Sequence, residues 1–360
     1  MSIHSALRCC ALLASLLAVG CAKEESSDQG ATTAAKTTEK VVIYNWTEYI
    51  PAAVLEQFTE ETGIEVEYAT YESNEAMYAK LKLLNGSGYD IVVPSTYYLE
   101  KMRNEGLLQP IQKDKLQNYG NLDSTMLNKS YDPNNDYSVP YLWGSTAIAV
   151  NTQDIDPNTI TQWSDLWKPE LSGKLMIMDD VRDIMAVGLT VAGYKDNTTS
   201  EEEVQAGYEA LKELWPSIKV INSDSPKTPL IQGNASVGVM WNGEAYMAQQ
   251  EMGSIAFIYP SDGAILWVDS FVIPKGASNV DNAHRFIDFM LRAESAKAAI
   301  EELGYAAPNT AAKDLLDDEL KNNKIIFPDA EDIARGTIHQ DLGESVLLYE
   351  KYWEMLKAGR

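Results

Sequence analysis

The 360-residue chain is poor in the residues on which cross-links, metal sites and nucleophilic catalysis depend, since it has three cysteines and three histidines. Cys9 and Cys10 lie in an N-terminal apolar stretch, which leaves Cys21 as the one cysteine of a chain cleaved behind that stretch. A disulfide framework and a cysteine-based metal site are therefore excluded. No G-x-S-x-G, H-E-x-x-H or P-loop pattern occurs either, so the sequence offers no motif for a serine hydrolase, a zinc protease or a nucleotide-dependent enzyme.

Basic residues are scarce as well. The chain has 29 lysines and arginines against 53 aspartates and glutamates, which gives a formal net charge of −24 at pH 7. A field of this sign repels nucleic acid and anionic lipid and attracts cations. The charge alone does not distinguish a cation-binding protein from an exported protein that is simply kept soluble by its acidity.

Long apolar runs are limited to the N-terminus. After Arg8, the stretch "CCALLASLLAVG" (residues 9–20) has the length of the hydrophobic region of a secretory signal and is too short to span a bilayer. We therefore predict a signal peptide over residues 1–20. Cys21 follows directly in "LAVGC", which resembles a bacterial lipoprotein signal, although Ala18 stands where a larger aliphatic residue is usual. We predict lipidation of Cys21, a flexible tether over residues 21–40, and a periplasmic protein that meets the membrane only through its lipid anchor.

The rest of the chain alternates between strand and helix patterns. We expect strands at 41–45, 64–70 and 89–94, with helices at 52–62 and 73–86 between them. A similar rhythm recurs from residue 146, with strands at 146–151, 174–178, 218–223 and 235–241, a helix near 201–214, and a helical segment from about Pro328. Strands joined through helices indicate an α/β protein. The length of the chain favours two lobes.

One apolar run raises a question about its single charge. The stretch "AILWVDSFVIP" (residues 264–274) is typical of a buried strand, where an unpaired carboxylate costs several kcal/mol. Asp269 has no basic residue within the run, and Trp267 shares its face of the strand. Either the strand is solvated and Asp269 is an ordinary surface residue, or Asp269 pairs with a cation that is not part of the chain.

Aromatic and acidic residues recur where the predicted strands end, and ligands of open α/β sheets bind beyond these carboxyl ends. The residues in these positions are Trp46, Thr47, Glu48 and Tyr49; Ser95, Thr96, Tyr97 and Tyr98; Asp179, Asp180 and Asp183; Trp241 and Asn242; and Trp267 with Asp269. Each one has an ordinary structural explanation, such as a buried tryptophan or a helix-capping aspartate. Together, aromatic faces and carboxylates suit an organic ammonium ion, through cation–π contacts and charge-assisted hydrogen bonds.

Two other readings use the same residues. A glycosidase could place a pair of carboxylates beside tryptophan platforms. A ferric-ion binder could use the neighbouring phenolates of Tyr97 and Tyr98, although such a site needs converging anionic ligands rather than surrounding aromatic rings.

Longer stretches carry a resemblance to a known family. They are "YNWTEYIP", "TYESNEAMYAKL", "VVPSTYY", "DPNNDYSVPYLWG", "WSDLWKPE", "WNGEA", "WVDS" and "GYAAPN". From about Val41 to Arg360 the chain resembles the PotD-like family of spermidine- and putrescine-binding periplasmic proteins, which serve bacterial ABC importers. The resemblance implies the two-lobed periplasmic binding protein-like II fold, with a mixed sheet flanked by helices in each lobe and the ligand in the cleft between them. It places lobe 1 at residues 41–145 plus 268–313 and lobe 2 at 146–267 plus 314–360.

The resemblance also implies the binding residues. Those expected to hold the methylene chain of the ligand are Trp46, Tyr49, Trp241, Trp267 and Tyr305, and those expected to contact its amines are Thr47, Glu48, Ser95, Tyr97, Asp180 and Asp269. Asp183 and His339 stand where the family has Glu and Gln, which leaves the preferred polyamine open. We expect His339 to line the pocket as a neutral imidazole, because it would lie beside an ammonium.

The implied protein is not an enzyme and needs no cofactor or metal. Its expected partners are a polyamine and the permease subunits of an ABC transporter, with no nucleic acid. The alternative with the same pocket is a polyamine sensor subunit that docks on a membrane signalling receptor.

Overall fold

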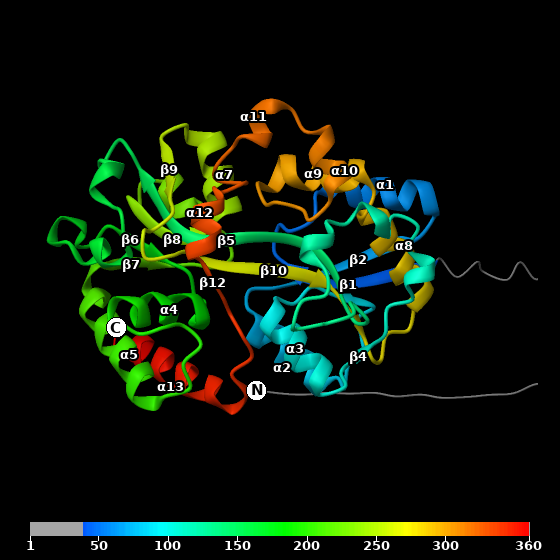
Figure 1. The fold of residues 1–360 in the computed structure, drawn as a ribbon, viewed down its shortest axis with the longest axis horizontal. Coiled ribbons are helices and arrows are strands. Elements are labelled where there is room, and N and C mark those ends of the chain that lie inside the picture. Colours follow the sequence, from blue (N-terminus) through cyan, green and yellow to red (C-terminus); the bar gives the residue numbers. More distant parts are fainter. Residues whose placement is uncertain (1–38, 360) are drawn as a thin grey trace, which may run out of the picture. The chain divides into compact units, whose positions relative to one another are not determined.

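The computed structural model describes residues 39–359. The predicted signal peptide, the predicted lipidation of Cys21 and nearly all of the predicted tether lie outside these residues. The described part is one compact unit built on two sheets (Figure 1). No helix within residues 39–359 is long and apolar enough to cross a membrane.

The first sheet has the strand order β2-β1-β3, with all three strands parallel. Its elements are β1 (Lys40–Trp46), α1 (Ala52–Thr62), β2 (Glu65–Tyr71), α2 (Asn74–Leu83), β3 (Ile91–Val92) and α3 (Thr96–Asn104). The predicted alternation of strand and helix is confirmed here. Gly63 ends α1 in the left-handed conformation with φ +72°, and the Ser73 side chain caps α2. An antiparallel bridge from Val92 to Val272 makes this sheet mixed.

The second sheet has the order β12-β10-β5-β8-β6-β7, and β9 also pairs with β5. Its strands are β5 (Val139–Asn151), β6 (Leu175–Ile177), β7 (Ile218–Ile221), β8 (Val237–Trp241), β9 (Ile255–Ile258), β10 (Ile265–Phe271) and β12 (Thr337–Ile338). β6 runs parallel to β7 and β8, whereas β5 runs antiparallel to β8 and β10. The sheet is therefore mixed, as the resemblance implied.

Helices cover both faces of the second sheet. Those on one face are α4 (Val181–Val191), α5 (Glu201–Leu214) and α13 (Val346–Ala358), and those on the other are α6 (Thr228–Ile231) and α7 (Asn242–Met252). Along β6, Leu175 and Ile177 pack in the core beneath α4, α5 and α13, and Met176 packs in the core beneath α6 and α7. Side chains of a strand alternate between its two faces in this way. Both faces of this sheet are thus buried.

The remaining elements pack around the first sheet or close the connections. They are β4 (Leu108–Gln109), β11 (Ile273–Pro274), α8 (Val280–Met290), α9 (Ala293–Leu303), α10 (Thr310–Leu315), α11 (Asp318–Lys321) and α12 (Ala330–Arg335). Phe58 of α1 contacts Phe286 and Phe289 of α8 edge-on in the core of this part. We call the part built on the first sheet lobe 1 and the part built on the second sheet lobe 2.

Two strands connect the lobes side by side. β5 and β10 pair antiparallel from Thr146↔Ile265 to Val139↔Phe271, and β10 also reaches lobe 1 through a bridge between Asp269 and Ser95 (Figure 1). Strand β5 begins seven residues before the predicted start at 146, because its first half belongs to this connection. A polar side chain on either strand is therefore placed between the lobes.

Helix α2 is shorter than the predicted helix at 73–86. Met77 and Leu81 are buried, whereas Leu84 is 37% exposed. Helix α2 ends at Leu83, so Leu84 is no longer at helical spacing from the other two residues.

Candidate functional site

A pocket lies between the two lobes, and its lining includes all thirteen residues that were predicted to bind ligand. These are Trp46, Thr47, Glu48, Tyr49, Ser95, Tyr97, Asp180, Asp183, Trp241, Trp267, Asp269, Tyr305 and His339. The space inside the pocket, with its open mouth, measures about 660 Å³.

The strand ends place these residues as expected. Trp46 is the last residue of β1 and Trp241 is the last residue of β8, one from each lobe. Tyr97 lies in the first turn of α3, directly after β3, and Asp180 caps α4, directly after β6. Not every strand-end residue points inward, since Asp179 binds the indole of Trp353 and the ammonium of Lys357.

Asp269 is buried, with 4% of its surface exposed. Its carboxylate accepts hydrogen bonds from Ser95 Oγ at 2.6 Å and from the Tyr49 hydroxyl at 2.8 Å. Burial raises the pKa of Asp269 to about 7, against the opposing effect of these two hydrogen bonds. Within residues 39–359, no lysine, arginine or histidine forms an ion pair with Asp269. The surface-strand reading is thus wrong, and the chain itself supplies only neutral donors.

Aromatic rings form the walls of the pocket. The Trp46 and Trp241 rings meet edge-on across the lobes, with centroids 5.9 Å apart, and the Tyr305 ring lies 5.3 Å from Trp267 and 5.4 Å from Tyr49. Trp267 also rests on β5 at Gly144, where an added Cβ would lie 2.7 Å from the indole. Glycine is therefore required at this position, because a side chain would push Trp267 out of its place.

His339 lines the pocket and lies between two carboxylates of lobe 2. Its Nε2 is 2.9 Å from Asp183 Oδ1 and its Nδ1 is 2.7 Å from Asp196 Oδ2. Burial alone would lower the pKa of His339, but the attraction of Asp196 and the hydrogen bonds that the ring donates to both carboxylates raise it to about 9. The expectation of a neutral His339 is therefore wrong, since Asp196 supplies a second negative charge that no sequence pattern indicated.

Both carboxylate oxygens of Asp183 already have hydrogen-bond partners within the chain. Its Oδ1 binds His339 and its Oδ2 accepts a hydrogen bond of 2.6 Å from Thr146 Oγ1 on β5. Asp180, by contrast, accepts hydrogen bonds only from the backbone amides of Arg182 and Asp183 as the cap of α4. Burial, together with the charges of Asp183 and Glu75, raises the pKa of Asp180.

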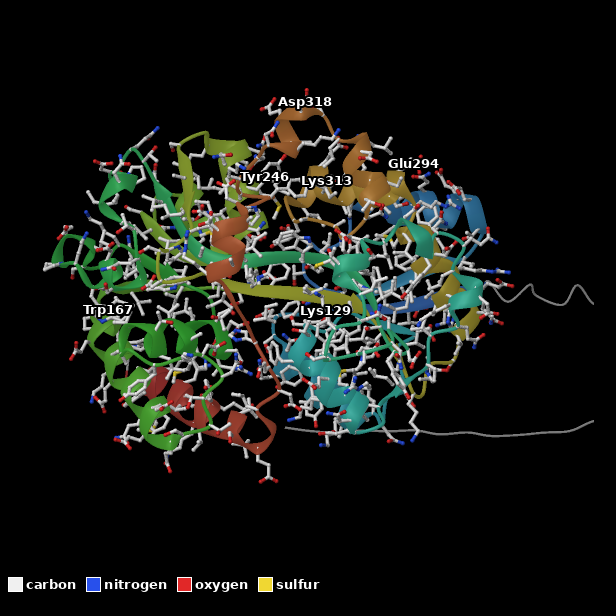
Figure 2. The ribbon with its side chains drawn as sticks, viewed as in Figure 1. Lys129, Trp167, Tyr246, Glu294, Lys313 and Asp318 are labelled. Carbon is white, nitrogen blue, oxygen red and sulfur yellow. The ribbon has the colours of Figure 1, made fainter. Side chains whose placement is uncertain are left out.

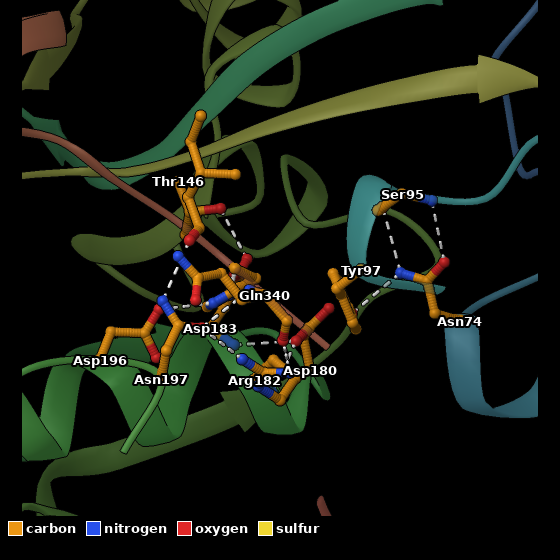
Figure 3. Close-up of polar contacts among 12 residues, drawn as sticks. Asn74, Ser95, Tyr97, Thr146, Asp180, Arg182, Asp183, Asp196, Asn197 and Gln340 are labelled. Atoms are coloured by element: carbon orange, nitrogen blue, oxygen red, sulfur yellow. Dashed lines mark hydrogen bonds and ion pairs between the residues drawn. The ribbon is translucent and has the colours of Figure 1, made fainter. Parts of the chain in front are cut away.

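Arg182 stabilises the end of the pocket that contains His339. Its guanidinium donates to the backbone oxygen of Gln340 at 3.2 Å and to Asn197 Oδ1 at 2.9 Å, and it lies 4.9 Å from the centre of the Tyr97 ring (Figure 3). The segment that carries His339 is thus fixed to α4 and faces Tyr97 of lobe 1.

The other end contains a lysine between two glutamates. Lys227 Nζ lies 2.6 Å from Glu48 Oε2 and 3.6 Å from Glu244 Oε2, and the backbone amide of Lys227 donates to Glu244 Oε2 at 3.1 Å. Glu244 is buried, whereas the Glu48 side chain is 57% exposed and its backbone has φ +50°. Because Glu48 follows β1 and Lys227 begins α6, this ion pair connects the two lobes.

Six lining residues were missed: Tyr71, Glu72, Asn74, Ser223, Asp224 and Glu244. Five of these follow the same strand-end rule as the others, at or just after the ends of β2 and β7, which had not been searched. The sixth, Glu244, lies in the first turn of α7, after Trp241. Among residues 39–359, no group of three or more histidine, cysteine, aspartate or glutamate side chains is arranged to hold a metal ion.

The chain is similar to known binding proteins. Residues 53–328 match the model of bacterial extracellular solute-binding proteins. The spermidine/putrescine-binding periplasmic protein of Salmonella typhimurium is 48% identical over 349 residues, which cover 97% of this chain and 98% of that protein. The Escherichia coli protein of the same name is 50% identical over 317 residues, with 88% and 91% covered.

Two solved structures extend this similarity to the fold. PotD of Streptococcus pneumoniae, a spermidine/putrescine ABC transporter substrate-binding protein, has a TM-score of 0.75 at 38% identity and covers 89% of this chain and 99% of its own. The TpPotD lipoprotein of Treponema pallidum has a TM-score of 0.78 at 30% identity, with 88% and 99% covered.

Proposed function

Because the chain belongs to the family of bacterial extracellular solute-binding proteins, we propose that it is the polyamine-binding protein of an ABC importer. It binds spermidine or putrescine outside the cytoplasm, without converting the ligand, and delivers it to the permease subunits. The observation that carries this proposal is Asp269, a buried carboxylate with neutral donors only, on a strand between the lobes. Such a group is stable when an external cation completes its pairing.

The aromatic walls support the same ligand. A polyamine alternates ammonium groups with methylene chains, so it needs carboxylates at intervals and apolar faces between them. Trp267 and Tyr305 adjoin Asp269, while Trp46 and Trp241 meet across the cleft. Each cation–π contact contributes about 0.5–2 kcal/mol. We propose that eleven of the thirteen predicted lining residues contact the ligand directly, whereas Asp183 and His339 bind each other and act on the ligand indirectly.

The lobes are proposed to close over the ligand by bending at β5 and β10, near residues 145/146 and 267/268. The third boundary, expected at 313/314, we now propose to lie between Ile326 and Thr337. Ile326 packs in the core that includes the first sheet, whereas Thr337 pairs with β10 in the second sheet. Closure of this kind buries the ligand and shrinks the protein.

The location of the protein is also part of the proposal. The relatives that carry the name are periplasmic proteins, and TpPotD is a lipoprotein. We propose that this chain is exported by residues 1–20, lipidated at Cys21 and held at the membrane by the tether over residues 21–40.

Titration calorimetry with putrescine, spermidine and spermine tests the proposed ligand. We expect at least one of them to bind with a Kd of about 1 μM or below, which corresponds to roughly −8 kcal/mol. Asp269→Asn should weaken that binding by about 2–5 kcal/mol, because a buried ammonium loses its counter-charge. Asp318→Asn, an exposed change on α11 far from the pocket, is the control and should bind as wild type does (Figure 2).

Two outcomes would contradict this proposal. A folded wild-type protein that binds none of the three polyamines is not a polyamine-binding protein. Equal affinities of wild type and Asp269→Asn would leave the protein a polyamine binder but remove the role given to Asp269.

A further inference from the structure

Five of the seven lining carboxylates of the pocket fall into three groups, which Asp269 connects through its neighbours. On one side, Ser95 binds Asp269, and Asn74 binds both Ser95 and the Tyr97 hydroxyl. The Tyr97 ring lies 5.5 Å from His339, which binds Asp183. This chain of contacts leads from Asp269 to the group of Asp180 and Asp183.

The third group lies on the other side of Asp269. The ring of Tyr305 packs against Trp267 and Tyr49 next to Asp269, and it also packs so closely on Gly243 that an added Cβ would lie 2.3 Å from it. Gly243 immediately precedes Glu244, which shares Lys227 with Glu48. The pocket therefore offers three anionic positions in a row, which is one for each ammonium of a triamine.

The chain itself provides cations for two of these groups. His339 binds Asp183, and Lys227 binds both glutamates. Among the lining carboxylates of the described chain, Asp269 and Asp180 are the two that are buried and have no ion pair with a lysine, arginine or histidine. Two buried carboxylates without a counter-ion match a ligand with two ammonium groups.

We propose that Lys227 is a specificity-determining residue that occupies the third anionic position, so that the pocket favours a diamine over a triamine. This inference rests on the proposed function and names the ligand class within it. A third ammonium at Glu48 and Glu244 has to displace the Lys227 ammonium or lie beside it, and like charges in close contact disfavour binding. A diamine leaves this ion pair undisturbed.

The arrangement of Lys227 supports such a role. Its side chain is 12% exposed, and its ammonium pairs with two lining residues, Glu48 and Glu244. Its own backbone amide binds Glu244, which fixes the residue at the start of α6. Attraction to both glutamates and their hydrogen bonds outweigh burial and raise the pKa of Lys227, so it is charged at neutral pH.

Calorimetry with putrescine and spermidine on wild type, Lys227→Gln and Lys324→Gln tests the inference. Lys324 pairs with Asp329 at 2.6 Å on the surface, so its variant removes an equal charge and an equally short ion pair away from the pocket. We expect wild type to bind putrescine at least as tightly as spermidine. Lys227→Gln should tighten spermidine binding roughly tenfold and change putrescine binding by less than about threefold. Lys324→Gln should leave the ratio as in wild type.

A second substitution identifies the source of the gain. In the Lys227→Gln background, Glu48→Gln removes one of the freed carboxylates and should abolish most of the gain for spermidine. The inference is overturned if Lys227→Gln leaves the spermidine-to-putrescine ratio unchanged, or if wild type prefers spermidine tenfold or more. Failure of the proposed function is a different result, in which wild type and both variants bind neither polyamine.

Discussion

At each end of the pocket a side-chain cation lies between two carboxylates, but the two ion clusters differ in their surroundings. His339, Asp183 and Asp196 all belong to lobe 2, and their side chains are 4–5% exposed. Lys227 and Glu244 belong to lobe 2 as well, but Glu48 comes from lobe 1 and is 57% exposed. One ion cluster is sealed within a lobe and the other bridges two lobes at the rim.

This difference assigns the two clusters to different tasks. A buried cluster that loses its cation retains unpaired charges in a medium that solvates them poorly, so it is essential to the stability of its lobe. In the second cluster the Glu48 side chain is 57% exposed, so its pair with Lys227 contributes less to stability and can exchange with a ligand. We therefore expect His339 to contribute mainly to the stability of the folded protein and Lys227 mainly to the choice of ligand.

The largest expected effect is on stability. His339→Leu leaves Asp183 and Asp196 buried without a counter-ion and should lower the free energy of unfolding by about 3–5 kcal/mol. Lys227→Gln should lower it by less, because the Glu48 carboxylate is largely solvated and the buried Glu244 keeps its hydrogen bond from the backbone amide of residue 227. Urea unfolding of both variants at pH 7 measures the two values. Equal losses of unfolding free energy in the two variants would contradict the different roles assigned to the two ion clusters.

The second expected effect is a pH dependence that belongs to His339. Its pKa is raised from 6.5 to about 9 in the folded protein, so its contribution is complete below pH 6.5 and is lost as the pH rises through 9. At about 1.4 kcal/mol per pH unit, this contribution is about 3 kcal/mol. It is measured as the difference in unfolding free energy between wild type and His339→Gln from pH 6 to pH 10, because the titrating carboxylates are common to both proteins. A difference that stays constant over this range would place the imidazole outside the ion cluster.

The smallest expected effect is on affinity. Below its pKa of about 7, Asp269 carries a proton that an ammonium ligand has to expel. Affinity should therefore fall as the pH drops from 7.5 to 5.5, by at most tenfold per unit for this group, which is about 2 kcal/mol in total. His339→Gln should show the same decline, since His339 is charged throughout this range. A flat profile in His339→Gln alone would restore the neutral imidazole that the sequence suggested.

Most of the fold and of the pocket lining was predictable. The strand-end rule found Trp46, Ser95, Asp180 and Trp241 because β-strands and helices leave regular patterns in the sequence. The same rule reaches Tyr71 and Asp224 when it is applied to every strand. The length of β5 was underestimated, since its first half connects the lobes and does not alternate with helices as the other strands do.

The electrostatic state of the pocket was not predictable. The protonation of His339 depends on Asp196, which lies 143 residues away in a loop without any periodic pattern. The pairing of Glu48 with Lys227 spans 179 residues and joins two lobes. Contacts of this kind follow from the packed structure, so a single sequence indicates the residues of the site more readily than their charges.

The position of His339 late in the chain has a consequence for synthesis and turnover. The pocket lining begins at Trp46 and ends at His339, in the segment that follows β12. A chain that stops before residue 337 retains Asp183 and Asp196 but has no imidazolium between them, and it lacks α13, which packs on α4 and α5. Such a chain should be less stable and more exposed to proteolysis. The pocket is therefore complete only after the segment that follows β12 has been synthesised.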